Sequence, residues 1–160
     1  MGWTVAIGVD THRDVHVAVA LDRLGGECGS VVVAADGNGY LALWRWAHGL
    51  GMPVFAVEGS GSYGAGLARF LLAAGAEVYE CERPRRAERR RGKNDLIDAT
   101  LAARQLLGTS VLARVRGGGV REDLRLLLLE RRGAVRARTA ALNQLQALVV
   151  TAPETLRARF

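Results

Sequence analysis

The stretch WTVAIGVDTHRDVHVAVALD, residues 3–22, decides the fold. Its first part, residues 3–10, is a continuous apolar run rich in β-branched residues, which is typical of a buried strand. The THRD segment then turns the chain, and residues 15–22 alternate as a half-buried strand does. A third apolar segment, residues 30–35, follows another turn that contains glycine. Short strands joined by tight turns predict an antiparallel meander.

From residue 37 onward, helical patterns alternate with strands. Apolar residues at helical spacing predict helices over residues 37–51 and 65–75, each ending on glycine. Residues 53–58 and 76–81 form the fourth and fifth predicted strands. Such alternation predicts parallel crossovers. We therefore expect an α/β fold in which helices flank a mixed five-stranded sheet.

The second half of the chain is organised around two helical segments. A helix is expected from about residue 94 to residue 107, directly after a basic segment. Residues 108–119 contain a glycine run and no clear periodicity, which is typical of a boundary. We expect a first domain at 1–110, a linker at 111–119 and a helical region at 120–160.

The helical region carries a coiled-coil pattern over residues 120–150. Four apolar residues recur every seven positions: Leu128, Val135, Leu142 and Val149. This repeat is typical of the seam of a coiled coil or a long helical hairpin. Arg131 and Arg138 occupy positions that would otherwise pack, and Pro153 ends the helix.

Charge is distributed unevenly along the chain, whose formal net charge is +6. Residues 1–82 carry 4 basic and 9 acidic side chains, whereas residues 83–93 carry 7 basic and 1 acidic. Residues 104–138 add 9 arginines against 3 acids. An acidic first half followed by two basic blocks indicates a polyanionic partner, such as nucleic acid, for the second half. A GC-rich genome would also favour arginine over lysine, so composition leaves that choice open.

Composition argues against several classes of protein. No run of about 18 apolar residues occurs, so we expect no membrane-spanning segment. The N-terminus lacks a basic leader followed by an apolar stretch and a cleavage site, so we expect a cytoplasmic protein. Cys28 and Cys81 lie far apart and outside any CxxC pattern, which predicts free, buried thiols rather than a zinc site.

Four carboxylates are expected to converge at one edge of the sheet. Asp10 ends the first predicted strand and Glu58 ends the fourth, and sites in such sheets gather at the carboxyl ends of strands. Asp95 and Asp98, three residues apart on a predicted helix, point the same way. Like charges this close repel one another, and a divalent ion relieves the repulsion. Oxygen ligands favour Mg²⁺ or Mn²⁺ over zinc, and such ions serve phosphodiester chemistry.

Single acids of this set also have structural explanations. Asp10 could cap a turn and Asp95 could cap a helix N-terminus, so the prediction rests on the set and its order along the chain. His12 and His16 flank the first turn at a spacing that would suit a metal pair on a helix. Because they lie around a strand turn, we do not expect them to bind metal.

The basic segment directly before Asp95 predicts contact with a nucleic-acid backbone. Its arginines would hold phosphates beside the acids, and this attraction is independent of sequence and sensitive to salt. A solvated loop of arginines is the alternative. The residues predicted to contact nucleic acid, in this segment and on the long helix, are Arg83, Arg85, Arg86, Arg89, Arg90, Arg91, Lys93, Arg131, Arg132, Arg136 and Arg138.

Four blocks of the sequence resemble one known family: IGVDTHRDVHVAVALD, VFAVEGSGSYGAGLARFL, RPRRAERRRGKNDLIDATLAAR and RRGAVRARTAALNQLQALVVTAPE. Together they are similar to the N-terminal part of the DEDD-type transposases of the insertion-sequence 110 family, over nearly the whole chain. The resemblance implies a RuvC-like domain of the ribonuclease-H type with a catalytic, Mg²⁺-binding tetrad at Asp10, Glu58, Asp95 and Asp98. It also implies DNA recombination during transposition, guided by a structured bridge RNA. The helical region at 120–150 would serve dimer or tetramer assembly.

Family members continue into a C-terminal transposase domain that supplies a serine nucleophile, and this sequence stops before it, so we expect the chain alone to be incomplete as an enzyme. Three other functions stay open. A Holliday-junction resolvase or ribonuclease of the same superfold would need a self-sufficient active site. A sugar-kinase or actin-like ATPase would need a second nucleotide-binding subdomain, for which 160 residues leave no room. A non-enzymatic RNA- or DNA-binding assembly module would need only the basic segments.

Overall fold

The structure of the chain is a computed structural model, which describes residues 2–81, 95–108, 112–115 and 117–159. It divides into two compact units, Met1–Gly117 and Gly118–Phe160. The first unit contains the β-sheet with its helices, and the second contains the long C-terminal helix. The domain limits expected at residues 110 and 119 stay predictions.

The first three strands form the predicted antiparallel meander. β1 (Val5–Thr11) pairs with β2 (Val15–Asp22), and β2 pairs with β3 (Glu27–Ala34), both in the antiparallel sense. β3 begins before residue 30, the predicted start, because its pairing with β2 continues past a shift in register to Glu27. The apolar pattern could not mark this extension, since β3 is an edge strand with mostly exposed side chains.

Parallel pairing begins with β4 (Pro53–Glu58), which lies beside β1. β5 (Val78–Cys81) lies beside β4 and is parallel to it. α1 (Gly37–Leu50) connects β3 to β4, and α2 (Ala65–Ala73) connects β4 to β5. The strand order is β3-β2-β1-β4-β5-β6. The predicted α/β architecture with a mixed sheet is therefore confirmed.

The sheet has six strands, and the prediction of five was wrong. The additional strand, β6 (Ala113–Arg114), lies within the segment expected to be a linker and pairs antiparallel with β5. The Arg114 side chain lies over the ring of Tyr79 at 5.7 Å and forms an ion pair with Glu77 at 3.1 Å. A strand of two residues has no periodicity to detect, so only its partner strand reveals it.

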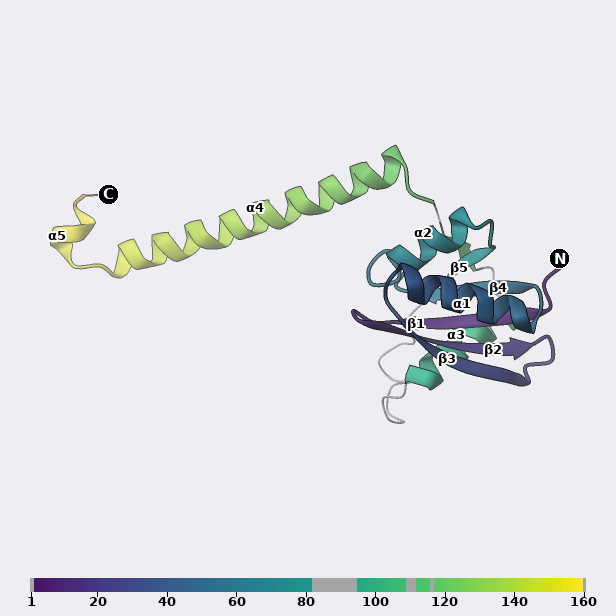
Figure 1. Cartoon of the computed structure of the whole chain (residues 1–160). Coiled ribbons are helices and arrows are strands. Elements are labelled where there is room, and N and C mark those ends of the chain that lie inside the picture. The colour runs from purple at the N-terminus through teal and green to yellow at the C-terminus, as the bar shows by residue number, and fades with distance from the viewer. Residues whose placement is uncertain (1, 82–94, 109–111, 116, 160) are drawn as a thin grey trace. The chain divides into compact units, whose positions relative to one another are not determined.

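Helices cover both faces of the sheet (Figure 1): α1 and α2 lie on one face, and α3 (Asp95–Leu107) lies on the other. The core beneath α1 and α2 includes Val5, Ile7 and Val9 of β1. The core beneath α3 includes Val17, Val19 and Leu21 of β2 with Ala99 and Ala103 of the helix. The side chains of β1 therefore alternate between an apolar core and the face that α3 covers.

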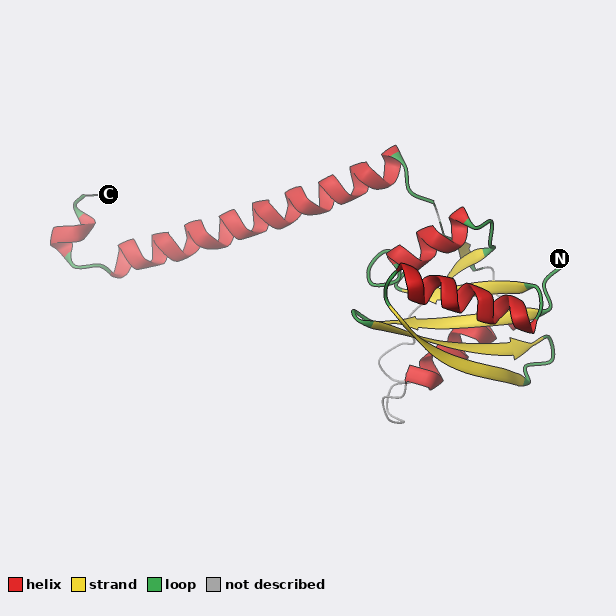
Figure 2. Cartoon of the chain, viewed as in Figure 1, coloured by secondary structure: helices red, strands yellow, loops and turns green. Residues whose placement is uncertain are grey.

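The second unit consists of α4 (Val120–Thr151) and the short α5 (Glu154–Arg157), drawn as red helices in Figure 2. The long helix predicted over residues 120–150 is confirmed, and Pro153 follows its end as predicted. Among the α4 side chains that the structure describes, none is buried. Within the described part of the chain, no helix combines the length and apolar character needed to cross a membrane.

The two cysteines differ in their environment. Cys81 is buried and free, as predicted, whereas Cys28 is exposed. The prediction of a buried thiol was wrong for Cys28, because edge strand β3 leaves most of its side chains in solvent.

Candidate active site

Asp10 lies near the carboxyl end of β1 and faces the side of the sheet that α3 covers. Side chains alternate along a strand, so Asp10 shares its face with Gly8, while Val9 packs into the core beneath α1 and α2. Asp10 is only 6% exposed. A carboxylate this deeply buried is costly unless a cation or hydrogen-bond donor meets it.

Close packing of α3 on β1 brings the first turn of the helix to Asp10. A Cβ atom on Gly8 would lie 2.0 Å from the carbonyl oxygen of Ala99 and 2.2 Å from the backbone nitrogen of Ala103. The backbone of α3 therefore occupies the space that a side chain at position 8 would fill. Asp95 precedes Ala99 by one turn on the same helical face, so the packing places Asp95 at the end of β1.

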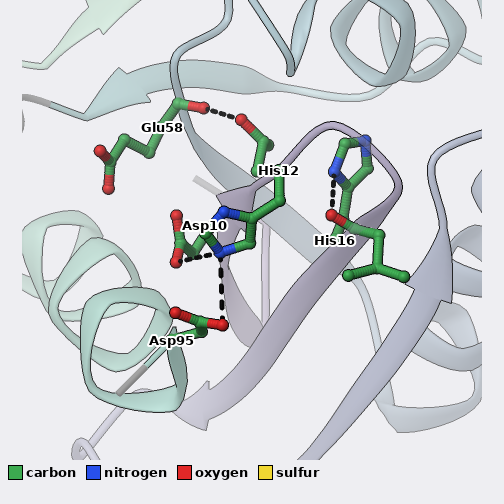
Figure 3. A network of polar contacts seen from close by, with 7 residues as sticks. Asp10, His12, His16, Glu58 and Asp95 are labelled. Atoms are coloured by element: carbon green, nitrogen blue, oxygen red, sulfur yellow. Dashed lines mark hydrogen bonds and ion pairs between the residues drawn. The ribbon is translucent and has the colours of Figure 1, made fainter. Parts of the chain in front are cut away.

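His12 lies between these two carboxylates (Figure 3). Its Nε2 atom is 3.1 Å from Oδ2 of Asp10 and 3.4 Å from Oδ2 of Asp95. One potential ligand atom from each of the three residues lies within 4.8 Å of the other two. Burial increases from Asp95, with a side chain 46% exposed, through His12 at 38% to Asp10 at 8%. The cluster thus has a buried floor and an open side.

Thr11 holds the end of β1 against the end of β4. Its hydroxyl group donates a hydrogen bond of 2.7 Å to the backbone carbonyl of Glu58, the last residue of β4. The backbone N–H of His12 donates to the carbonyl of Val15 at 3.1 Å, across the turn to β2. These two hydrogen bonds hold the chain at Thr11 and His12 against β4 on one side and β2 on the other.

Burial raises the pKa of the Asp10 carboxyl group above its ordinary value. His12 acts in the opposite direction, and the negative charges of Glu58, Asp98 and Asp95 raise the pKa further. Because charge–charge interactions weaken with distance, all three of these acids lie near enough to Asp10 to influence it. The same cluster of charge would attract a cation.

The predicted site residues fall into three groups. Asp10 and Asp95 are brought together through His12, and Glu58 and Asp98 lie within electrostatic reach of Asp10; the catalytic role of the four stays a prediction. The four arginines predicted on α4 are exposed: Arg131, Arg132, Arg136 and Arg138. The remaining predicted nucleic-acid contacts lie outside the described residues: Arg83, Arg85, Arg86, Arg89, Arg90, Arg91 and Lys93.

His12 is the residue of this cluster that the sequence analysis considered and did not expect to join the acids. The informative spacing was the one between Asp10 and His12, since residues two apart at the end of a strand share a face. His16 is not part of the cluster. It is fully buried, stacks on Tyr40 with ring centroids 5.8 Å apart, and donates from Nδ1 to the carbonyl of Val15 at 3.1 Å.

The donor atoms of the cluster fit a divalent cation. Carboxylate oxygens are the ligands that Mg²⁺ and Mn²⁺ prefer, and imidazole nitrogen is a common ligand of transition metals. Nε2 of His12 is buried, and it has no hydrogen-bond partner of acceptable geometry among the described residues although two carboxylates lie near it. A nitrogen that faces two oxygens without donating to either is suited to a shared ion.

A pocket of about 380 Å³ lies away from this cluster. Its lining includes Trp3, Trp44, Met52 and Pro53, from α1 and from the segments at the amino ends of β1 and β4. The acids lie instead at the opposite, carboxyl end of these parallel strands. An open edge of this kind can receive a substrate larger than a pocket would hold.

Comparison with known families decides the assignment. The family model of the DEDD transposases of the insertion-sequence 110 (IS110) family, described as a transposase, matches residues 7–152. The chain belongs to this family. The match begins within β1 and ends just after α4, so it includes both units of this DEDD transposase chain. No curated protein matches the chain. The resemblance seen in the four sequence blocks is therefore confirmed, and family membership supports a transposase function.

Proposed function

We propose that this chain is the N-terminal, divalent-metal-dependent domain of a DEDD transposase and takes part in DNA strand cleavage and exchange during transposition. The observation that carries the proposal is the meeting of Asp10 and Asp95 around His12 at the carboxyl end of β1. The family match over residues 7–152 adds the chemical context. The order of the four predicted acids along the chain, Asp-Glu-Asp-Asp, agrees with the family's name.

In this proposal, Asp10, Glu58, Asp95 and Asp98 hold Mg²⁺ or Mn²⁺. When bound, such an ion polarises a phosphoryl oxygen and stabilises the charge that develops during phosphodiester cleavage. The protein's contribution is to hold the carboxylates in place before substrate arrives. Burial in the sheet fixes Asp10, the packing of α3 on Gly8 fixes Asp95, and the Thr11 hydrogen bond fixes the end of β4.

The ribonuclease-H-type, RuvC-like fold is part of the proposal. It is supported by an antiparallel meander that continues into parallel crossovers, with β1 central in the order β3-β2-β1-β4-β5-β6. It is also supported by the position of the acids at the end of β1 and at the start of α3, which are the positions expected from the resemblance.

The nucleic-acid and assembly roles extend the proposal to the rest of the chain. The basic residues 83–93 precede Asp95 directly in sequence and would hold DNA or guide RNA beside the acids. On α4, the heptad residues Leu128, Val135 and Leu142 are 43%, 49% and 48% exposed. Pairing of α4 helices in a homodimer or homotetramer would bury this apolar seam.

A calorimetric titration of the purified chain with Mn²⁺ tests the metal site. Saturable binding is expected in the unaltered protein, and Asp10→Asn and Asp95→Asn are each expected to weaken it about tenfold or more. Asp14→Asn is the matched control, because the Asp14 side chain is 86% exposed and pairs with Arg13 outside the cluster. Binding that survives both cluster substitutions unchanged would contradict a shared site.

A second function, that of a non-catalytic nucleic-acid-binding assembly module, is favoured by the exposed arginines and leucines of α4. Nucleic-acid affinity measured in the presence of Mn²⁺ separates the two functions. A pure binding module keeps its affinity in Asp10→Asn and Asp98→Asn, whereas a site organised by metal loses part of it.

A further inference from the structure

We propose that His12 is a ligand of the divalent ion, beside Asp10 and Asp95, and that its imidazole gives the site a preference for Mn²⁺ over Mg²⁺. The inference rests on the proposed function, because it takes the acidic cluster to be a metal site. It adds a nitrogen ligand to a site for which the sequence predicted oxygen ligands alone.

The spacing of the three ligand atoms suits a single octahedral ion. Two ligands that lie about 2.1 Å from an ion and at right angles to each other are about 3 Å apart. Nε2 of His12 is 3.1 Å from Oδ2 of Asp10 and 3.4 Å from Oδ2 of Asp95. Both separations are close to those of neighbouring ligands, and the ligand atoms of Asp10 and Asp95 lie within 4.8 Å of each other.

The orientation of the imidazole supports coordination rather than a simple ion pair. If His12 only neutralised charge, its N–H would be expected to point at one carboxylate. Nε2 is buried, yet no described residue accepts a hydrogen bond of acceptable geometry from it. In Figure 3 this nitrogen points between Asp10 and Asp95. The direction of its N–H is also the direction of its lone pair when the proton is absent, so the lone pair is aimed at the space that the carboxylates share.

The backbone around His12 is fixed well enough to hold a ligand. Thr11 is 6% exposed, and its hydroxyl donates to the carbonyl of Glu58 at 2.7 Å. His12 itself donates from its backbone N–H to the carbonyl of Val15 at 3.1 Å. The imidazole therefore extends from a backbone that is tied to β4 on one side and to β2 on the other, and the site loses little conformational entropy when an ion binds.

The choice between metals follows from the chemistry of imidazole. Mg²⁺ is bound mainly through oxygen and keeps several water molecules, whereas imidazole is a softer ligand that suits transition metals. A nitrogen ligand at position 12 therefore strengthens the binding of Mn²⁺ more than that of Mg²⁺. The Mn²⁺ to Mg²⁺ affinity ratio is set by this residue, while the carboxylates provide affinity for both ions.

Pulsed electron paramagnetic resonance of the Mn²⁺-loaded full chain tests ligation directly, without an activity measurement. The unaltered protein is expected to show hyperfine coupling from one directly bound nitrogen, and His12→Ala is expected to lose it. His48→Ala is the matched control, because His48 is an exposed histidine on α1 and should leave the coupling unchanged. Circular dichroism of each variant verifies that the fold is intact.

Calorimetric affinities for Mn²⁺ and Mg²⁺ test the preference. His12→Ala is expected to weaken Mn²⁺ binding about tenfold or more and Mg²⁺ binding by a smaller factor. His12→Glu places an oxygen ligand within reach of the same position. It is expected to retain metal binding, lose the nitrogen coupling and lower the Mn²⁺ to Mg²⁺ ratio, which also keeps the test decisive if His12→Ala does not fold.

The outcomes separate this inference from the proposed function. Binding that is abolished in Asp10→Asn and Asp95→Asn but shows no nitrogen coupling overturns ligation by His12 and leaves the acidic metal site intact. An unchanged metal ratio in His12→Ala and His12→Glu overturns the preference. If the unaltered protein binds no Mn²⁺, either alone or with duplex DNA, both the inference and the metal part of the proposed function are overturned.

Discussion

Asp10 makes the metal-free fold sensitive to pH. Its pKa is raised above the ordinary value of 3.8, chiefly by burial, so folding favours the neutral carboxyl group. The stabilisation that this group contributes is complete below pH 3.8 and is lost as pH rises through its folded-state pKa. Asp10→Asn keeps the shape and removes the charge. We therefore expect it to raise the melting temperature at neutral pH, measured by thermal denaturation in the presence of a chelator.

The control for this prediction is Asp14→Asn, which changes an exposed acid in the turn between β1 and β2 and should leave the melting temperature nearly unaltered. Saturating Mn²⁺ should instead give the unaltered chain a higher melting temperature than Asp10→Asn. Metal binding stabilises the folded state, and Asp10→Asn weakens that binding. A metal-free Asp10→Asn protein that melts below the unaltered chain would contradict this electrostatic explanation.

At the residue scale, the sequence predicted the positions of the acids in the fold better than the position of His12 beside them. Asp10 and Glu58 each close an apolar run, and Asp95 begins a helical pattern, so all three could be placed at element ends. The part played by His12 depends on α3 reaching the end of β1, and no local pattern encodes that distance. The alternation that puts residues 10 and 12 on one face indicates only that His12 lies beside Asp10.

At the scale of elements, the contact between α3 and β1 depends on the missing side chain of Gly8. Gly8→Ala is expected to lower the free energy of unfolding by about 3 kcal/mol, because its Cβ would lie 2.0 Å from the carbonyl oxygen of Ala99. It should also weaken Mn²⁺ binding, since relief of the clash moves Asp95 away from Asp10. Chemical denaturation and calorimetry measure the two effects.

Gly37→Ala is the matched control for this substitution, because a Cβ at Gly37 meets nothing within 4 Å. Its unfolding and its metal binding should be close to those of the unaltered chain. If Gly8→Ala behaved like Gly37→Ala, α3 would not be packed as closely as the structure indicates.

Element type was predictable along most of the described chain, and element limits less so. The strands of the meander, the two crossover helices and the long helix each have a period that their sequence displays. β6 was missed because an edge strand of only two residues shows no period. β3 was predicted too short because its first residues, Glu27 and Cys28, are exposed. Both failures concern sheet edges, where pairing is decided by the partner strand.

At the scale of the whole molecule, acidic and basic residues are separated along the sequence, and this separation predicts how salt affects binding. Replacing Arg89, Arg90 and Arg91 together by alanine is expected to weaken binding to DNA or RNA. The slope of log affinity against log salt should decrease by about one unit per lost phosphate contact. Equilibrium binding measured over a series of salt concentrations gives this slope.

The matched control replaces Arg13, Arg23 and Arg69 by alanine. It removes the same number of charges from the acidic part of the sequence, 1–82, and should change the slope little. An unchanged slope in the triple substitution at residues 89–91 would show that this segment does not contact phosphates.

The placement of Asp95 on α3 also bears on the order in which the protein is made. The ribosome synthesises β1 and β4, with Asp10 and Glu58, well before residues 95–107. Until α3 emerges, the nascent sheet leaves Val17, Val19 and Leu21 uncovered on the face where the acids lie. Such a chain is a natural substrate for chaperones. Tight metal binding, which needs Asp95, would then occur only after α3 has been synthesised. Only chains whose first unit is complete would bind the ion tightly.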